Sequence, residues 1–320
     1  MFTNIFGHGQ ITDYLQRLIE TGDLPSCLLF HGPEGVGKRT TALEVAKRLN
    51  CTGTRKAGCS CASCHKIESG NHLDIMDYVP DGKTFKIDQV RDLINESNRS
   101  RMEGNVRVFL LNDAQRLGIK AADALLKTLE DGRENTLFIL LSTSKTALVP
   151  TLVSRSLDFY FGALSDDAVR SVLESKGHRG ASVDHAVRLG GGSISKTLYF
   201  LEGEGLQLRN DVLSLLCEYP HIKDFRVITK VNEYSDQIGE FLETLYVLLS
   251  DLCLVERDLT DFVQNQDILG QLSGLKNRFG PKCFNAFSLV RAVRHRQEDP
   301  IALDHHVKSV LLDLKDEFRT

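Results

Sequence analysis

The segment that most restricts the fold lies near the N-terminus, where an apolar run, a glycine-rich loop and a helical pattern follow one another. Residues 27–30 are continuously apolar, which is typical of a strand buried on both faces of a parallel sheet. Three glycines fall within 32–37, and residues 41–49 have the composition of a helix. This order predicts an α/β domain with the loop at the carboxyl edge of its sheet.

The next hundred residues continue the alternation of strands and helices. Further strands are expected at 73–79, 106–111 and 136–141, and helices at 11–20, 87–94 and 121–129. Strands that alternate with helices are joined by crossover connections, so we expect a mostly parallel sheet with helices on both faces.

From about Leu164 onward the strand pattern stops. Ser165 with two following acids is typical of a helix start, and glycines at 190–192 end a small helical segment. Apolar residues recur at helical spacing over 238–252 and 303–314. The sequence therefore predicts three domains: an α/β domain over 1–164, a small helical domain over 165–205 and a helical domain over 206–320.

The glycine-rich segment matches the first seven positions of the phosphate-binding loop, G-x-x-x-x-G-K. In such loops backbone N–H groups at a helix N-terminus cradle phosphates and the lysine pairs with their charge, so ATP or ADP is the ligand class to consider. The next position, which normally carries the magnesium-binding Ser or Thr, is an arginine here. The candidate nucleotide-binding residues of the loop are Gly32, Gly35, Gly37, Lys38, Arg39 and Thr40.

The strand expected at 106–111 ends in Asn112 and Asp113. In nucleotide hydrolases this strand end carries an acid that holds the metal, and an acid that follows activates water. Because Asn112 is neutral, two metal-binding positions are altered together, which weakens the expectation of hydrolysis and of nucleotide binding. The alternative is ordinary variation in a working ATPase.

Four of the eight cysteines, Cys51, Cys59, Cys61 and Cys64, lie within fourteen residues. Four thiolates suit a closed structural zinc site, although a single residue between Cys59 and Cys61 is a tight spacing and His65 is a substitute ligand. A redox pair at Cys61 and Cys64 is the alternative. The remaining cysteines are expected as buried free thiols in a reducing compartment; they are Cys27, Cys217, Cys253 and Cys283.

The charge balance excludes a global basic surface. Lys and Arg number 39 against 43 Asp and Glu, a net charge of −4, so contact with nucleic acid has to be local or shared with partners. No run approaches the roughly 18 apolar residues that cross a bilayer, and the first residues lack a signal-peptide pattern. We expect a cytoplasmic protein without membrane contact.

Five short motifs together resemble the clamp-loader branch of the AAA+ family, from bacterial DNA polymerase III. They lie at 5–10, 32–38, 124–130, 154–156 and 191–194, whereas 206–320 is similar only as a helical region. The resemblance implies a parallel-sheet P-loop AAA+ domain, a small helical lid and a C-terminal helical collar. It also implies zinc, because similar subunits carry four cysteines in the same insertion.

Within this family the motor subunits (gamma/tau) have Thr after the loop lysine and Asp-Glu at the end of the strand that corresponds to 106–111. They also have an Arg soon after the Gly-Ser of the lid. Here these positions are Arg39, Asn112-Asp113 and Ser195. The resemblance thus implies a non-motor subunit without hydrolysis at its own loop. An active motor ATPase and a small-molecule P-loop kinase are the alternatives, although the acceptor and lid residues of such kinases have no evident counterpart.

The motif Ser154-Arg155-Ser156 resembles the family's Ser-Arg-Cys, whose arginine reaches the ATP of a neighbouring subunit. The resemblance implies that Arg155 acts in trans, with gamma/tau and delta subunits as partners and with the sliding clamp and primed DNA contacted through the complex. The alternative is an arginine that only pairs with a surface acid.

Overall fold

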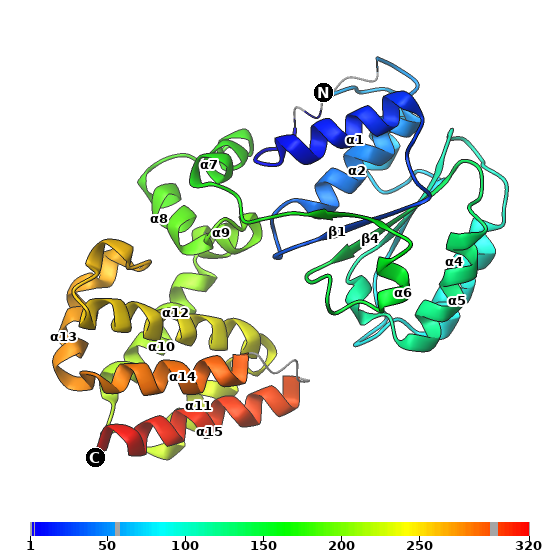
Figure 1. The fold of residues 1–320 in the computed structure, drawn as a ribbon. Helices are drawn as coiled ribbons and strands as arrows, with labels where there is room; N and C mark the ends of the chain where they lie inside the picture. The colour runs from blue at the N-terminus through cyan, green and yellow to red at the C-terminus, as the bar shows by residue number, and fades with distance from the viewer. Residues whose placement is uncertain (1, 3, 55–57, 295–299, 320) are drawn as a thin grey trace. The chain divides into compact units, whose positions relative to one another are not determined.

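The computed structural model describes residues 2, 4–54, 58–294 and 300–319 (Figure 1). The chain forms two compact units. The first comprises Met1–Arg179 with Gly191–Ser195, and the second comprises Gly180–Gly190 with Lys196–Thr320. The three-domain division at residues 164 and 205 stays a prediction.

The first unit is built on a five-stranded sheet in the order β2-β3-β4-β1-β5, with every neighbouring pair parallel. This confirms the expected parallel sheet. The strands are β1 (Cys27–His31), β2 (Ile75–Tyr78), β3 (Arg107–Leu111), β4 (Thr136–Ser142) and β5 (Leu157–Tyr160). The sequence did not predict β5, because this edge strand has only Phe159 fully buried and therefore lacks a continuous apolar run.

Helices cover both faces of this sheet, as expected. The helices of the unit are α1 (Gly9–Thr21), α2 (Lys38–Asn50), α3 (Ala62–Glu68), α4 (Ile87–Ser97), α5 (Ile119–Glu130), α6 (Pro150–Val153) and α7 (Asp166–Ser175). One apolar core packs α1 and α2 against side chains such as Phe30 and Leu110, and another packs α4 and α5 against Leu29 and Phe109. Neighbouring residues of β1 and β3 thus point to opposite faces.

A buried ion pair fixes the start of β3. Asp74 is fully buried and accepts backbone N–H bonds from Met102, Glu103 and Gly104 at 2.7–3.1 Å. The guanidinium of Arg107, which is 2% exposed, lies 3.4 Å from the Asp74 carboxylate. Burial opposes the ionised form, but the N–H bonds and Arg107 outweigh it and lower the pKa of Asp74.

In the second unit every described element is helical, which agrees with the sequence pattern. The helices are α8 (Ala181–Gly190), α10 (Glu204–Glu218), α11 (Asp224–Glu233), α12 (Ile238–Glu256), α13 (Leu269–Phe279), α14 (Lys282–Arg294) and α15 (Pro300–Arg319); α9 (Ile194–Leu201) begins in the first unit. The predicted stripe of α12 is buried and packs against α10, α13, α14 and α15. None of the helices described is both long and apolar enough to cross a membrane.

Candidate nucleotide loop, arginine and cysteine metal centre

The glycine-rich loop lies between β1 and α2, as predicted. Gly37 precedes the first residue of α2 with φ of 101°, a conformation that favours glycine. The loop therefore ends at the positive N-terminus of a 13-residue helix, the position at which phosphate-binding loops hold anions.

The side chain of Lys38 is hydrogen-bonded to the start of its own loop. Its ammonium donates hydrogen bonds to the carbonyl oxygens of Gly32 at 2.6 Å and Pro33 at 2.5 Å. Burial lowers the pKa of Lys38, and the nearby carboxylates of Glu34 and Asp113 act in the opposite direction. The predicted lysine thus lies inside the loop, and Asp113, which directly follows β3, lies nearby.

The segment Gly191–Ser195 packs directly on this loop. The backbone N–H of Ile194 donates to the carbonyl of Gly35 at 2.9 Å. A Cβ at Gly35, whose φ is 74°, would lie 2.3 Å from Ser193 Oγ, so the close approach requires glycine. Ser195, which the resemblance aligns with the family's phosphate-sensing position, is exposed next to this contact.

Arg39 and Asn112, the two positions at which the sequence departs from the expected metal ligands, both donate to the carboxylate of Asp77. Arg39 donates from Nε to Asp77 Oδ2 at 3.1 Å and makes a second, shorter contact from Nη2 to the same oxygen. Asn112 donates from Nδ2 to the other oxygen of Asp77 and to the carbonyl of Tyr78 at 3.1 Å. Sequence reasoning missed Asp77; the one available signal was an acid within the strand expected at 73–79, which the structure places beside β3.

The remaining two predicted positions do not join this network. Thr40 is exposed on α2. Asp113 has a φ of 51° after β3 and accepts a hydrogen bond from Gln115 Nε2 at 3.1 Å. The loop thus has the expected glycines and lysine, whereas Arg39 and Asn112 are each hydrogen-bonded to Asp77.

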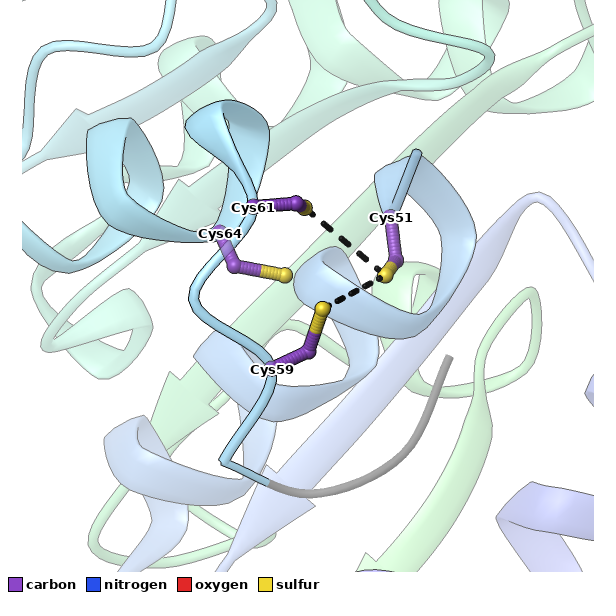
Figure 2. Close-up of side chains that lie close together, drawn as sticks. All are labelled: Cys51, Cys59, Cys61 and Cys64. Carbon is purple, nitrogen blue, oxygen red and sulfur yellow. Dashed lines mark hydrogen bonds between the residues drawn. The ribbon is translucent and has the colours of Figure 1, made fainter. Parts of the chain in front are cut away.

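The four clustered cysteines converge, as Figure 2 shows. Their sulfur atoms all lie within 4.8 Å of one another, with Cys51 Sγ 3.6 Å from Cys59 Sγ and 3.9 Å from Cys61 Sγ. A tetrahedral ion with zinc–sulfur distances of about 2.3 Å separates its sulfurs by about 3.8 Å. The cluster is therefore positioned to hold a metal ion despite the single residue between Cys59 and Cys61. His65 is exposed on α3.

Asn50, which sequence reasoning also missed, is the last residue of α2 and joins the start of the cysteine-bearing insertion to the segment before β3. Asn50 is buried; its Oδ1 accepts the backbone N–H groups of Asn105 and Val106 at 2.7 and 2.9 Å. Ser63 Oγ donates to the Asn50 carbonyl at 2.8 Å, which ties α3 to the end of α2. These bonds hold Cys51 and Cys64 on two fixed elements.

Local contacts favour a thiolate at Cys61, whereas burial and the neighbouring cysteines raise the pKa of Cys64. The hydrogen bond from the Thr52 side chain, helped by the backbone of Cys64, lowers the pKa of Cys61 to about 5. Thiolates are the form that binds metals. Outside the cluster, Cys27 and Cys283 are buried as expected and Cys253 is half-buried, but Cys217 is exposed because it lies on the outer face of α10, so its expected burial is wrong.

Arg155 lies in the turn between α6 and β5. Its guanidinium donates from Nε to Glu130 Oε1 at 2.6 Å and from Nη1 to the carbonyl of Thr151 at 3.2 Å. The Arg155 side chain is 37% exposed and that of Glu130 is 50% exposed. The pairing with a surface acid is thus present in the chain by itself, and the role of Arg155 toward a neighbouring subunit stays a prediction.

Comparison with known proteins shows which sequences the first half of the chain is similar to. The family model described as "DNA polymerase III, delta subunit" matches residues 7–165. The tau subunit of Escherichia coli K12 DNA polymerase III is 33% identical over 175 residues, which are 54% of this chain and 27% of that protein. The delta prime subunit of Bacillus subtilis is 32% identical over 165 residues, which are 51% and 50% of the two chains.

The delta prime subunit of Pseudomonas aeruginosa is 32% identical over an alignment of 183 positions, which covers 52% of this chain and 56% of that protein. A solved DNA polymerase III gamma subunit-related protein of Thermotoga maritima has a TM-score of 0.49 and 14% identity over 94% of this chain and 99% of its own. The chain thus spans about a quarter to about half the length of these three curated relatives. By these sequence matches residues 7–165 of the chain belong with the bacterial DNA polymerase III clamp-loader subunits that include delta prime.

Proposed function

We propose that this chain is a delta prime subunit that does not hydrolyse ATP at its own loop and that supplies Arg155 to the ATP site of a neighbouring motor subunit. The observation that carries this proposal is a contrast within one domain. Arg39 and Asn112, at the metal positions, are bound to Asp77, whereas Ser154-Arg155 is retained on the surface.

The chemistry favours an arginine at such a position. A guanidinium placed against a transferring phosphoryl group offsets the charge that develops in the transition state. The pair between Arg155 and Glu130 is exposed, and exposed ion pairs contribute only about 0–1 kcal/mol. Arg155 can therefore exchange its carboxylate partner for a phosphate on assembly at little cost.

The proposed partners are the gamma/tau motor subunits and the delta subunit, with the sliding clamp and primed DNA engaged through the complex. The net charge of −4 supports contact with DNA through partners rather than by this chain alone. We further propose that residues 165–205 act as the lid and 206–320 as the collar through which the subunits assemble.

Reconstitution tests the proposal. The protein is combined with motor subunits, delta and clamp, and clamp loading onto primed DNA is measured with and without it. Equal loading without this chain would refute the proposal. In the same assembly, Arg155→Ala should lower DNA-dependent ATP hydrolysis, while Arg91→Ala, another exposed arginine paired with an acid, should not.

An active motor ATPase of the gamma/tau type is the second candidate. The intact loop with Lys38 and the 33% identity to the tau subunit of E. coli favour it. The isolated protein distinguishes the two candidates, because a motor subunit hydrolyses ATP with magnesium whereas the proposed delta prime subunit does not.

For the cysteine cluster we propose a structural zinc ion. Four thiolates leave no open coordination position, so a catalytic zinc is disfavoured. The sulfur separations of 3.6 Å from Cys51 to Cys59 and 3.9 Å from Cys51 to Cys61 support a tetrahedral ion, and Cys61 and Cys64 are free cysteines rather than a bonded pair.

A further inference from the structure

Arg39, Asp77 and Asn112 belong to three different elements and form one hydrogen-bonded network. Arg39 lies in the first turn of α2, Asp77 lies in β2, and Asn112 directly follows β3. Each oxygen of the Asp77 carboxylate accepts from one of the other two side chains. The network therefore spans the space between the start of α2 and the carboxyl ends of two adjacent strands.

The family implies magnesium at this place, and the donor set tests that implication. Magnesium takes oxygen ligands in near-octahedral geometry. A guanidinium only donates hydrogen bonds, so Arg39 offers no ligand. The Asn112 nitrogen faces two acceptors, Asp77 Oδ1 and the Tyr78 carbonyl, which fixes the orientation of its amide. The residues present do not fit a magnesium ion.

The charges lead to the same conclusion. The carboxylate of Asp77, the acid within this network, is already neutralised by Arg39 at 3.1 Å. A divalent cation placed here would meet the positive charges of Arg39 and Lys38, with Glu34 of the loop and Asp113 after β3 as the acids near Lys38. Repulsion between like charges acts against the metal, and the loss of the partly exposed Arg39–Asp77 pair adds little to it.

We propose that the Arg39–Asp77–Asn112 network replaces the magnesium site, so that this loop holds no divalent cation beside a nucleotide phosphate. The inference rests on the proposed function, in which the loop is a degenerate nucleotide site. Asp77 joins the two altered positions, and its hydrogen bonds with Arg39 and Asn112 take the place of the metal ligands.

The test uses Mn²⁺ as a paramagnetic probe for magnesium and measures water-proton relaxation with ADP and the full-length protein. Mn²⁺ held by a protein relaxes water protons faster than Mn²⁺·ADP alone. We expect the wild-type protein to give no enhancement above Mn²⁺·ADP. An enhancement that Lys38→Ala removes would place the cation at the loop and overturn the proposal.

The variant Arg39→Thr with Asn112→Asp tests the two residues directly. It restores a hydroxyl and a second carboxylate beside Asp77, an oxygen-rich set that suits a divalent cation. Relaxation enhancement should appear in this variant and stay absent in Arg91→Thr with Asn95→Asp, which makes the same charge change on the exposed face of α4.

Failure of the folded double variant to gain enhancement would overturn the assignment to these two residues. Should this variant not fold, the wild-type and Lys38→Ala measurements still decide the proposal. All of these measurements use the isolated subunit. A metal found at the loop therefore refutes this inference without touching the role of Arg155, which is tested in the assembled loader.

Discussion

The guanidinium of Arg155 is bound to the carboxylate of Glu130, the last residue of α5, with Nε and Oε1 2.6 Å apart. The two residues come from motifs that are 25 positions apart in the chain, and each belongs to a segment that resembles the clamp-loader family. The pair holds Arg155 on the surface of the first unit rather than in its core.

The first prediction concerns the strength of this pair. Glu130→Gln should change the free energy of unfolding by less than about 1 kcal/mol, because both side chains are exposed and water screens their attraction. Urea unfolding of the isolated protein measures the change, with Asp88→Asn, which weakens the exposed Asp88–Arg91 pair, as the matched control. A loss of more than about 2 kcal/mol would mark the pair as a structural element and would support the surface-pair alternative.

The second prediction concerns the cysteine cluster. Protein purified without chelators should contain about one equivalent of zinc, and Cys64→Ser should lose most of it because one of four thiolate ligands is removed. The variant should also unfold at a lower temperature, since metal bound to the folded state stabilises that state. Elemental analysis and thermal denaturation measure both effects.

Cys217→Ser is the matched control for the metal, because this exposed cysteine lies outside the cluster. It should keep the metal and the unfolding temperature of the wild type. Less than about half an equivalent of zinc in the wild-type protein, or equal retention in both variants, would contradict a zinc site at the cysteine cluster.

The sequence was most informative where burial imposes a repeating pattern. Strands β1, β3 and β4 are buried on both faces, so their continuous apolar runs could be recognised, and the periodicity of α12 was equally clear. The edge strand β5 was missed, because a strand with one exposed face and a short length leaves no comparable run.

For the candidate site, the sequence indicated positions but not the contacts between them. The loop motif identified Lys38 and the altered Arg39 and Asn112, yet Asp77 could not be found because its role depends on β2 lying beside β3. Glu130 is similar, since its contact with Arg155 depends on how α5 and α6 pack. The sulfur atoms of Cys59 and Cys61 lie close together because of the local backbone conformation, which the spacing of the cysteines does not reveal.

The third prediction concerns the buried pair of Asp74 and Arg107. Asp74→Asn should destabilise the protein by about 3–5 kcal/mol, because Arg107 is 2% exposed and loses the charge that compensates it. Urea unfolding near neutral pH measures the loss. The control Asp81→Asn, at an exposed pair with Lys86, should cost less than about 1 kcal/mol.

The Asp74 pair also predicts an acid dependence. The folded protein holds the pKa of Asp74 below its usual value of 3.8, so the stabilisation is complete above the pKa of the unfolded state and is lost as pH falls toward the folded pKa. The difference in stability between wild type and Asp74→Asn should therefore shrink below about pH 4. A difference that stays constant from pH 7 to pH 3 would contradict this account.

The fourth prediction concerns His8, whose ring nitrogen contacts Val36 in the glycine-rich loop. His8 is 7% exposed, its Nε2 lies 2.9 Å from the carbonyl oxygen of Val36, and its ring packs against Phe161 at 4.8 Å. A carbonyl only accepts, so Nε2 carries the proton of this bond. Burial lowers the pKa of His8 below 6.5, and the bond to Val36 opposes that shift only in part.

The unfolded chain therefore binds a proton to His8 at a higher pH than the folded protein does. The contribution of His8 to stability is complete above about pH 6.5 and is lost as pH falls toward the folded pKa. Urea unfolding at pH 8 and pH 5.5 should show a larger acid-induced loss for the wild type than for His8→Gln, because glutamine does not titrate. His221→Gln, at an exposed histidine of the second unit, should lose as much as the wild type, and equal losses in all three proteins would contradict the prediction.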